Sequence, residues 1–334
     1  MNRRHAIRAL LVTAALNASG IAVGQPTKKM PRIGYLGPSG ETAPHLLKAF
    51  QDGLAALGYV EGRSVVVEYR WTNAGNRMTD EGTLLANARE LVALNVDVLA
   101  ASIDPAIVAA SKATRTVPIV MLNVSDPVEL GLVSSLAHPG GNVTGLTRLS
   151  PDLVGKNLEI LLEVVPAANR IGLLVSGSDA TKRNSVANAR EAAQKRAVTL
   201  QIVEVLTAQD LDAAFAKLKK SNAQAVLVSD TGGGIFFTQR DRIAELAVAH
   251  RLPSVFANTE NVEAGALMSY SHGSVANYRR AGAFIDKILR GAKAGDIPIE
   301  QPTQFELAIN MKTAKALNVV IPQSLLLRAD RVFE

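Results

Sequence analysis

Short apolar runs alternate with helix-forming segments along nearly the whole chain, and this alternation constrains the fold more than any other feature. Strands that alternate with helices of this length indicate right-handed β-α-β units and a parallel sheet. The runs come in two sets of about four, and 334 residues are enough for two domains. We therefore predict an α/β protein with two Rossmann-like, doubly wound lobes. The apolar runs are residues 33–36, 64–69, 97–102 and 118–122, and then 170–176, 199–205, 223–229 and 253–257.

The C-terminal part does not fit two lobes that simply follow one another. Ala266–Tyr270 and residues 304–310 read as extra strands, and each is followed by a helical segment. We therefore expect the chain to cross between the lobes near Gly141–Pro151, around Gly265 and at Pro298–Pro302. The predicted lobes are residues 31–147 plus 266–297 for lobe 1, and residues 148–265 plus 298–334 for lobe 2.

The first 24 residues have the pattern of a signal peptide. A basic start is followed by a mildly apolar stretch and by the small residues Ala22-Val23-Gly24, which predicts cleavage before Gln25 and a periplasmic protein. Arg3-Arg4 allows twin-arginine export, but Ala6 stands where that route usually has a large apolar residue, so the general secretory route is favoured. The alternative interpretation is an N-terminal helix that frays.

Charge and cysteine content exclude several classes of protein. The net charge is +6, and three of the 36 basic residues lie in the predicted signal peptide, which leaves 33 against 30 acidic residues. The remaining charges are mixed in sign, so we expect no nucleic-acid partner. The chain has no cysteine, which excludes disulfides, thiolate nucleophiles, cysteine-bound metals and a lipid-modified N-terminal cysteine.

The sequence pattern of one strand-to-helix junction occurs twice in the chain. "PIVMLNVSDPVELG" (Pro118–Gly131) and "PSVFANTENVEAG" (Pro253–Gly265) share Pro-x-Val, an asparagine and Val-Glu-x-Gly. Ligands of open parallel sheets bind beyond the carboxyl ends of the strands. If the two sheets face each other, the two junctions line opposite walls of one cleft.

The loops after the strands carry short polar side chains, and each precedes a helix whose free N–H groups can hold an anion. Asp230 could accept a hydrogen bond from a ligand ammonium, so the set suits a zwitterion or a small polar acid. The candidate ligand-binding residues are Pro38, Ser39, Ser102, Asp104, Asn123, Ser125 and Asp126, with Ser178, Asp230, Thr231, Asn258 and Tyr270 later in the chain.

Several of these residues have structural alternatives. Asp126 precedes a proline, as a helix N-cap does. Ser102 and Ser178 could also serve only as caps, and Asp230 precedes the Gly-rich "TGGG", where a turn residue is typical. Tyr270 at a strand end could simply pack.

Enzyme and cofactor signatures are missing from the sequence. No nucleophile elbow, dinucleotide fingerprint or P-loop appears, and no two histidines have the spacing of metal ligands. His45 and His250 lie in predicted helices and are interpreted as surface or capping residues. We therefore predict no enzyme activity, no metal and no cofactor. A periplasmic hydrolase or isomerase on a similar fold is kept as a less favoured hypothesis.

Several long stretches, in order, make the chain resemble the periplasmic substrate-binding components of ABC transporters. The similarity is to the type I family that includes tryptophan- and tyrosine-type binding proteins, and it spans Ile33 to Glu334. It implies two lobes joined by three crossovers that close over one small ligand, and delivery to a membrane permease with an ATPase. We also expect the protein to be a monomer. The stretches are "SDPVELGLVSSLAHPGGNVTGLTRLSPDLVGKNLEIL", "RIAELAVAHRLPSVFA", "VEAGALMSY" and "DKILRGAKAGDIPIEQPTQFELAINMKTAKALNVVIPQSLLLRAD".

The resemblance also suggests roles for particular residues. Amino-acid binders of this kind hold the ligand carboxylate at the positions of Ser102 and Asn123–Ser125, and the ammonium at that of Asp230. Pro38-Ser39 would complete the floor of the site, and Tyr270 would lie near the hinge.

One loop departs from the family pattern, and one other function stays open. "VSGSDAT" (175–181) replaces the Asn-Pro-rich sequence often found there, so the second wall is undefined. The favoured hypothesis is an exported solute-binding protein for an amino acid or small organic acid, which meets the membrane only through its permease. The alternative is a ligand-sensing module that signals to a membrane sensor.

Overall fold

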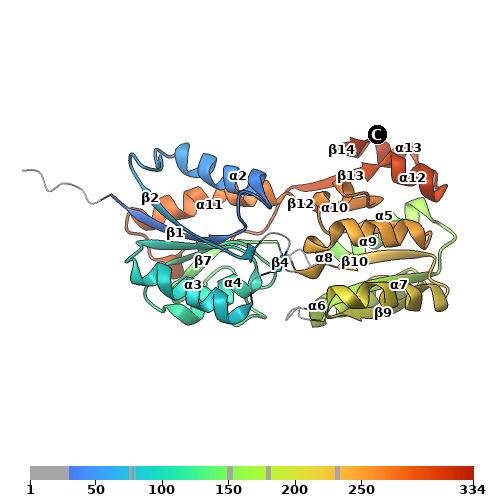
Figure 1. The fold of residues 1–334 in the computed structure, drawn as a ribbon, viewed down its shortest axis with the longest axis horizontal. Helices are drawn as coiled ribbons and strands as arrows, with labels where there is room; N and C mark the ends of the chain where they lie inside the picture. Colours follow the sequence, from blue (N-terminus) through green and yellow to red (C-terminus); the bar gives the residue numbers. More distant parts are fainter. Residues whose placement is uncertain (1–29, 75–76, 79, 149–152, 178–181, 230–233) are drawn as a thin grey trace, which may run out of the picture. The chain divides into compact units, whose positions relative to one another are not determined.

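The chain forms two α/β lobes, each built around its own mostly parallel sheet (Figure 1). A computed structural model describes residues 30–334 except 75–76, 79, 149–152, 178–181 and 230–233. From Pro31 to Glu334 the chain is one compact unit. None of the helices in these described residues combines the length and the apolar character needed to cross a membrane. The two predicted lobes are confirmed.

Lobe 1 contains a five-stranded parallel sheet with helices on both faces (Figure 1). Side chains alternate across the strands, so Tyr35 packs with α2 and α11 while its neighbour Leu36 packs with α3 and α4. In sheet order the strands are β2 (Val66–Trp71), β1 (Arg32–Gly37), β5 (Val98–Ala101), β6 (Ile119–Val124) and β7 (Val143–Thr147); the helices are α2 (Pro44–Ala55), α3 (Glu81–Ala93), α4 (Asp104–Ala113) and α11 (Ser274–Leu289), and β3 (Asn73–Ala74) pairs with β4 (Arg77–Met78).

Lobe 2 contains a seven-stranded sheet in which only the β12–β13 pair is antiparallel. Helices α5, α6, α12 and α13 cover one core, and α7 and α9 cover the other. In sheet order the strands are β14 (Arg331–Phe333), β13 (Phe305–Asn310), β12 (Met268–His272), β11 (Ser254–Phe256), β10 (Ala225–Ser229), β8 (Arg170–Ser176) and β9 (Thr199–Val205); the helices are α5 (Leu153–Val164), α6 (Lys182–Lys195), α7 (Leu211–Lys220), α8 (Ile235–Thr238), α9 (Arg240–Ala249), α10 (Thr259–Glu263), α12 (Met311–Leu317) and α13 (Gln323–Leu326), with 3-10 turns η1 (Ala208–Asp210) and η2 (Ala294–Asp296).

Both sheets reverse their strand order at an equivalent place. In lobe 1 the chain runs from β1 to β2 and then returns past β1 to β5; in lobe 2 it runs from β8 to β9 and returns to β10. The crevice at such a reversal is where open α/β sheets bind ligands. The loops at the lobe 1 reversal are described, whereas residues 178–181 and 230–233 of lobe 2 lie outside the described residues.

The chain passes between the two sheets three times: after β7, between β12 and α11, and before β13. The predicted assignment of residues 266–297 to lobe 1 differs from the observed pairing. β12 pairs with β11 and β13 of lobe 2, because Leu267 and Met268 complete the apolar core of that lobe. Residues 298–302 were predicted to belong to lobe 2 but contact lobe 1. The N–H of Glu300 donates to the carbonyl of Gly145 in β7 at 3.0 Å.

Two glycines allow α11 to pack closely on α2. A Cβ on Gly282 would lie 2.5 Å from the carbonyl oxygen of Gly53, and a Cβ on Gly53 would collide with the backbone of Arg279. This close approach anchors α11 on lobe 1 directly after the crossover from β12 of lobe 2.

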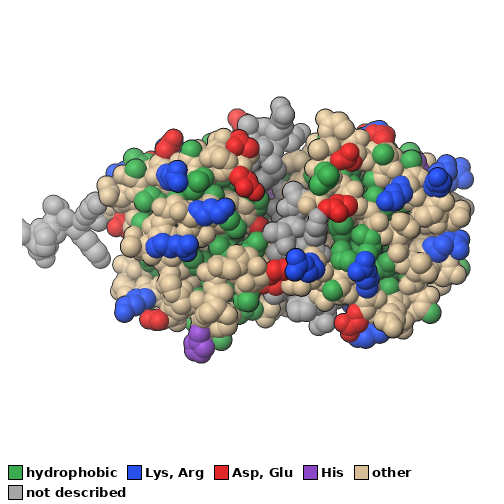
Figure 2. All heavy atoms as spheres, turned by 90° about the horizontal axis from the view of Figure 1, so that it is seen from below, with side chains coloured by type: hydrophobic (Ala, Val, Ile, Leu, Met, Phe, Trp, Pro, Cys, Tyr) green, Lys and Arg blue, Asp and Glu red, His purple; other side chains and the backbone are tan. Residues whose placement is uncertain are grey.

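Charges of both signs are interspersed over the two lobes on the face shown in Figure 2. Phosphate-backbone binding requires clustered lysine and arginine. The described part of this face therefore lacks the continuous basic surface that nucleic-acid binding uses.

Candidate functional site

A cluster of polar side chains lies at the carboxyl ends of β5, β6 and β7, where the sequence predicts the first wall of the site. Four predicted residues are buried there with exposed fractions of 0–9%: Ser102, Asp104, Asn123 and Ser125. Parallel strands end at one edge of the sheet, which is why residues from separate loops meet. Two of these four contact each other directly.

Asp104 and Ser125 tie the loop after β5 to the end of β6. The backbone N–H of Ser125 donates to Asp104 Oδ1 at 2.9 Å, and the hydroxyl of Ser125 donates to Oδ2. Asp104 follows Ile103, whose φ of +67° lies in a region that β-branched residues avoid. Such strain costs about 1–3 kcal/mol and persists where surrounding contacts hold it, often at functional sites.

Arg148, which the sequence reasoning missed, joins this cluster from the end of β7. Its backbone N–H donates to the carbonyl of Val124 at 2.8 Å, and its Nη2 lies 3.6 Å from Asp104 Oδ2. The side chain is only 9% exposed. Arg148 therefore places a buried cation beside the carboxylate of Asp104 at this edge.

A chain of amide hydrogen bonds fixes the orientation of His272, the last residue of β12. Asn277 donates from Nδ2 to the carbonyl of Thr147 at 3.4 Å and to Asn123 Oδ1 at 3.2 Å. Asn123 Oδ1 is therefore the acceptor that faces His272 Nε2 at 2.9 Å. His272 consequently carries its proton on Nε2. Its other ring nitrogen, Nδ1, is a lone-pair acceptor.

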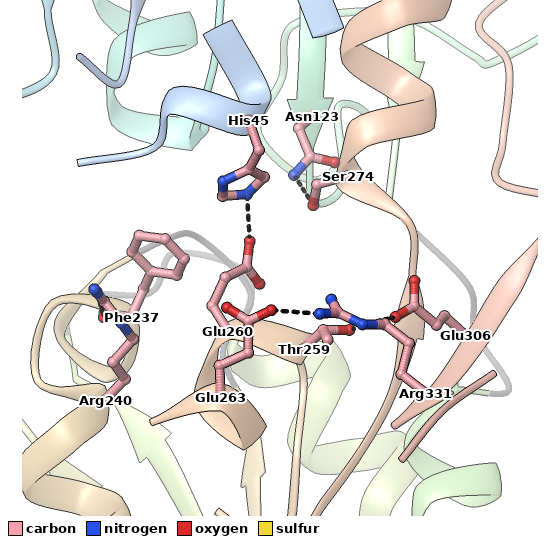
Figure 3. Close-up of polar contacts among 10 residues, drawn as sticks. All are labelled: His45, Asn123, Phe237, Arg240, Thr259, Glu260, Glu263, Ser274, Glu306 and Arg331. Atoms are coloured by element: carbon pink, nitrogen blue, oxygen red, sulfur yellow. Dashed lines mark hydrogen bonds and ion pairs between the residues drawn. The ribbon is translucent and has the colours of Figure 1, made fainter. Parts of the chain in front are cut away.

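Burial keeps the side chains of His272 and Tyr278 neutral. Burial, with the nearby charge of Arg148, lowers the pKa of His272 to about 3. Burial also raises the pKa of Tyr278, whose hydroxyl is hydrogen-bonded to that of Ser102. Ser102 therefore bonds α11 of the same lobe. Asn123 reaches toward Ser274 at the start of α11, with Nδ2 and Oγ 3.4 Å apart (Figure 3).

Other predicted residues hold local structure in this conformation. The carbonyl of Ser39 accepts from Thr42 and Ala43 in a turn, and Pro38 accepts from Tyr35 at 3.3 Å. Asp126 Oδ1 accepts from the next two free N–H groups, those of Val128 and Glu129, at 3.0 Å each. The residues that follow, 127–131, form turns rather than the helix that an N-cap would begin, so Asp126 stabilises a turn and the predicted helix cap is wrong.

Of the residues predicted for lobe 2, the structure describes Asn258 and Tyr270. Asn258 precedes α10 and makes no side-chain cap bond there. Tyr270 stacks on Phe305 with ring centroids 5.6 Å apart, as its packing alternative predicted. Ser178, Asp230 and Thr231 lie outside the described residues.

One hydrogen bond connects the helices that face the site from the two lobes. His45 Nε2 in α2 lies 3.0 Å from Glu260 Oε1 in α10 (Figure 3). The bond raises the pKa of His45, and although burial raises the pKa of Glu260, its bond to His45 brings the pKa below the ordinary value. The sequence interpretation of His45 as a surface or capping residue named no partner, because 215 residues separate the two.

The described residues contain no group of three or more histidine or acidic side chains arranged to hold a metal ion. The cluster instead offers a guanidinium, amides, hydroxyls and a neutral imidazole. These are groups that recognise a small polar molecule.

Two lobes with mostly parallel sheets define the fold of type I periplasmic binding proteins. The chain belongs to the ABC transporter substrate-binding protein family, which it matches over residues 39–333. This is a family of binding proteins rather than enzymes, so the predicted class is confirmed.

Individual relatives support the same grouping. The chain is 28% identical over 275 residues to a tyrosine-binding protein of Clostridioides difficile (strain R20291), covering 81% of this chain and 76% of that protein. It is 26% identical to an ABC domain of Streptococcus pneumonia solved in complex with L-Trp, with a TM-score of 0.81 and 91% and 99% of the two chains covered. A leucine-binding protein, LivK of Thermotoga maritima, shares the fold at 12% identity, with a TM-score of 0.59 and 86% and 87% covered.

Proposed function

We propose that the protein captures an aromatic α-amino acid in a cleft between its lobes and delivers it to an ABC permease. The observation that carries this proposal is the buried polar cluster at the carboxyl edge of β5, β6 and β7, next to the strand-order reversal. The cluster combines a cation with hydrogen-bonding groups of both kinds, which suits a zwitterion.

Two observations support an aromatic amino acid as the ligand. One similar protein is named a tyrosine-binding protein, and another was solved in complex with L-Trp. In this chain Trp71 ends β2 beside Gly37, is 38% exposed and stacks on Tyr69 with centroids 5.3 Å apart. An exposed indole at the ligand-binding edge of a sheet offers a face for a second aromatic ring.

The second wall of the cleft is proposed to come from lobe 2. Asp230 remains the proposed partner of the ligand ammonium, with Ser178, Thr231 and Asn258 on the same wall. An Asp230→Asn variant keeps the size of the side chain and removes the charge. We expect its affinity to fall by about 2–5 kcal/mol, the usual loss for one partner of a desolvated charge pair; a change below threefold would remove Asp230 from the proposal.

Direct binding measurements test the function. L-tryptophan, L-tyrosine and L-phenylalanine are compared with L-leucine, L-glutamate and their deaminated acids by thermal shift and calorimetry. A ligand at 100 times its Kd stabilises the protein by about 2.7 kcal/mol. Stabilisation by the aromatic amino acids alone is the expected result; binding of none of the panel would refute the amino-acid assignment.

Closure is the proposed mechanism, because the three crossovers can act as hinges. Small-angle scattering should give a smaller radius of gyration with the bound amino acid than without it. An unchanged profile at saturation would contradict closure.

Export of the protein is proposed because residues 1–24 have the pattern of a signal peptide. N-terminal sequencing of protein from the periplasm should begin at Gln25. Protein there that still begins with Met1 would disprove cleavage.

A further inference from the structure

The guanidinium of Arg148 is buried without the hydrogen bonds that such a group ordinarily makes. Its Nε and Nη2 atoms are inaccessible to solvent, and neither has a hydrogen-bond partner among the residues that the structure describes. Buried donors are nearly always paired, since an unmet charged donor costs more than the 1–3 kcal/mol of a neutral one. The two donors therefore require an explanation.

Asp104 compensates the charge of Arg148 but does not satisfy these donors. The 3.6 Å between Nη2 and Asp104 Oδ2 is longer than a hydrogen bond. Asp104 already accepts from the backbone and the hydroxyl of Ser125 through its two oxygens. The pair is thus an electrostatic contact that leaves the donor edge of the guanidinium unused.

The two unpartnered atoms are the two that form one edge of a guanidinium. The N–H bonds of Nε and Nη2 run nearly parallel, and together they match the two oxygens of a carboxylate in a bidentate bond. Lysine lacks this geometry, because its ammonium is a point charge on a flexible stem.

A second unpartnered atom lies near the same charge. His272 Nδ1 is buried and has no partner in the described part of the chain. The amide chain through Asn277 and Asn123 makes Nδ1 an acceptor, as shown above. Arg148 lies near enough to affect the ionisation of His272. The cluster therefore has unused donors and an unused acceptor, which is the pattern that a ligand with an anion and an N–H group completes.

We infer that Arg148 binds the carboxylate of the ligand through Nε and Nη2, and that His272 Nδ1 accepts a hydrogen bond from the same ligand. This inference rests on the proposed amino-acid-binding function and identifies the anion-binding residue of that site. It also changes the role predicted for Ser102 and Ser125, whose hydroxyls bond Tyr278 and Asp104 and so position the cluster.

Matched ligands separate a carboxylate-binding role from a structural one. Calorimetry compares L-tryptophan with L-tryptophanamide, and L-tyrosine with L-tyrosinamide, on the parent and on Arg148→Gln and Arg148→Lys. We expect the parent to bind each acid at least 30-fold more tightly than its amide. Arg148→Gln should lose at least 30-fold for the acid and change little for the amide, and Arg148→Lys should not recover the parent affinity.

Arg280→Gln is the matched control, because Arg280 lies in the same lobe and pairs with Glu300 at the surface. It should leave the affinity for both acid and amide unchanged. Equal losses for acid and amide in Arg148→Gln would overturn the inference while leaving the proposed function intact, and so would a parent that does not distinguish acid from amide.

Urea unfolding of the ligand-free protein gives a second readout that needs no ligand. Arg148→Lys keeps a positive charge beside Asp104 and removes the donor edge of the guanidinium, so it should unfold at a midpoint close to that of the parent while its affinity for the acid falls. A clearly lower midpoint for Arg148→Lys, together with equal losses for acid and amide, would make Arg148 a structural partner of Asp104 and overturn the inference. If neither amino acid binds the parent, the proposed function fails and the carboxylate assignment, which depends on it, is rejected with it.

Discussion

His45 in lobe 1 and Glu260 in lobe 2 are joined by a hydrogen bond of 3.0 Å between Nε2 and Oε1. The nearby charges act in opposite directions on His45, since Glu263 raises its pKa and Arg331 lowers it. Figure 3 shows Glu263 paired with Arg331 below the bond. We expect this contact to make the conformation in which α2 and α10 meet depend on pH.

Ligand affinity should weaken as the pH rises through the raised pKa of His45. The contact is fully formed below the ordinary histidine value of 6.5 and is lost above the raised value; at the acid end it is lost as the pH falls through the lowered pKa of Glu260. His45 is exposed and Glu260 is partly buried; a pair with an exposed partner contributes about 0.2–1 kcal/mol, so the loss of affinity is at most about fivefold. Calorimetry with L-tryptophan from about pH 5 to about pH 8 measures it.

His45→Gln is the control for this dependence. His272 stays neutral over that range because its pKa is about 3, so the variant should bind with a nearly constant affinity. A pH dependence that survives in the variant would assign the effect to another group.

Asp104→Ala should be among the most destabilising single changes in lobe 1. It removes the acceptor of the Ser125 N–H and leaves Arg148 as an uncompensated buried charge, at a cost of about 3–5 kcal/mol. Urea unfolding measures the loss. Asp126→Ala removes a partly exposed aspartate that accepts two N–H bonds in the turn after β6, and it should cost about 1 kcal/mol. Equal losses in the two variants would contradict the buried role of Asp104.

Gly282→Ala should loosen α11 from α2. The added Cβ would lie 2.5 Å from the carbonyl oxygen of Gly53, so the helices must separate, at about 1–3 kcal/mol. Gly155→Ala in α5 is the matched change, because its Cβ would make an ordinary 3.5 Å contact with Ala192. Thermal unfolding should show a loss for the first variant and no loss for the second. A tolerated alanine at position 282 would show that the close approach is not needed.

Trp71 is the single tryptophan of the chain and should report on ligand binding. If an aromatic ligand stacks on its exposed face, L-tyrosine should change the indole emission excited at the red edge of its absorption. Trp71→Ala should then bind up to about tenfold more weakly, and Trp71→Phe should recover most of the affinity, since a stacked aromatic pair contributes about 0.5–1.5 kcal/mol. Unchanged emission together with unchanged affinity in the alanine variant would exclude Trp71 from the site.

Local patterns were sufficient to predict that four polar residues lie at one edge of the lobe 1 sheet. Ser102, Asp104, Asn123 and Ser125 each follow an apolar strand, and the carboxyl ends of neighbouring parallel strands meet at one edge. Asp126-Pro127 predicted a helix N-cap, but the residues that follow form turns, in which Asp126 accepts from two nearby backbone N–H groups. These features depend only on residues a few positions apart.

Contacts between residues far apart in the chain could not be predicted from the sequence. Tyr278 meets Ser102 across 176 positions, and His272 meets Asn123 across 149. Neither short motif, "SH" or "NY", carries a signal for its partner. The placement of β12 in lobe 2 and of α11 in lobe 1 also depends on which apolar core each one completes, and that choice is made between alternatives far apart in the chain.

The sequence by itself determined two α/β lobes, the family and the loops at which a ligand is expected, because hydrophobic periodicity and turn chemistry act over short distances. Only the tertiary structure decided that Arg148 is buried beside Asp104 with its donor edge unused, and that the proton of His272 lies on Nε2. Burial and hydrogen-bond partners arise when the two sheets, α11 and the crossovers pack together, and no single segment of the chain contains that information.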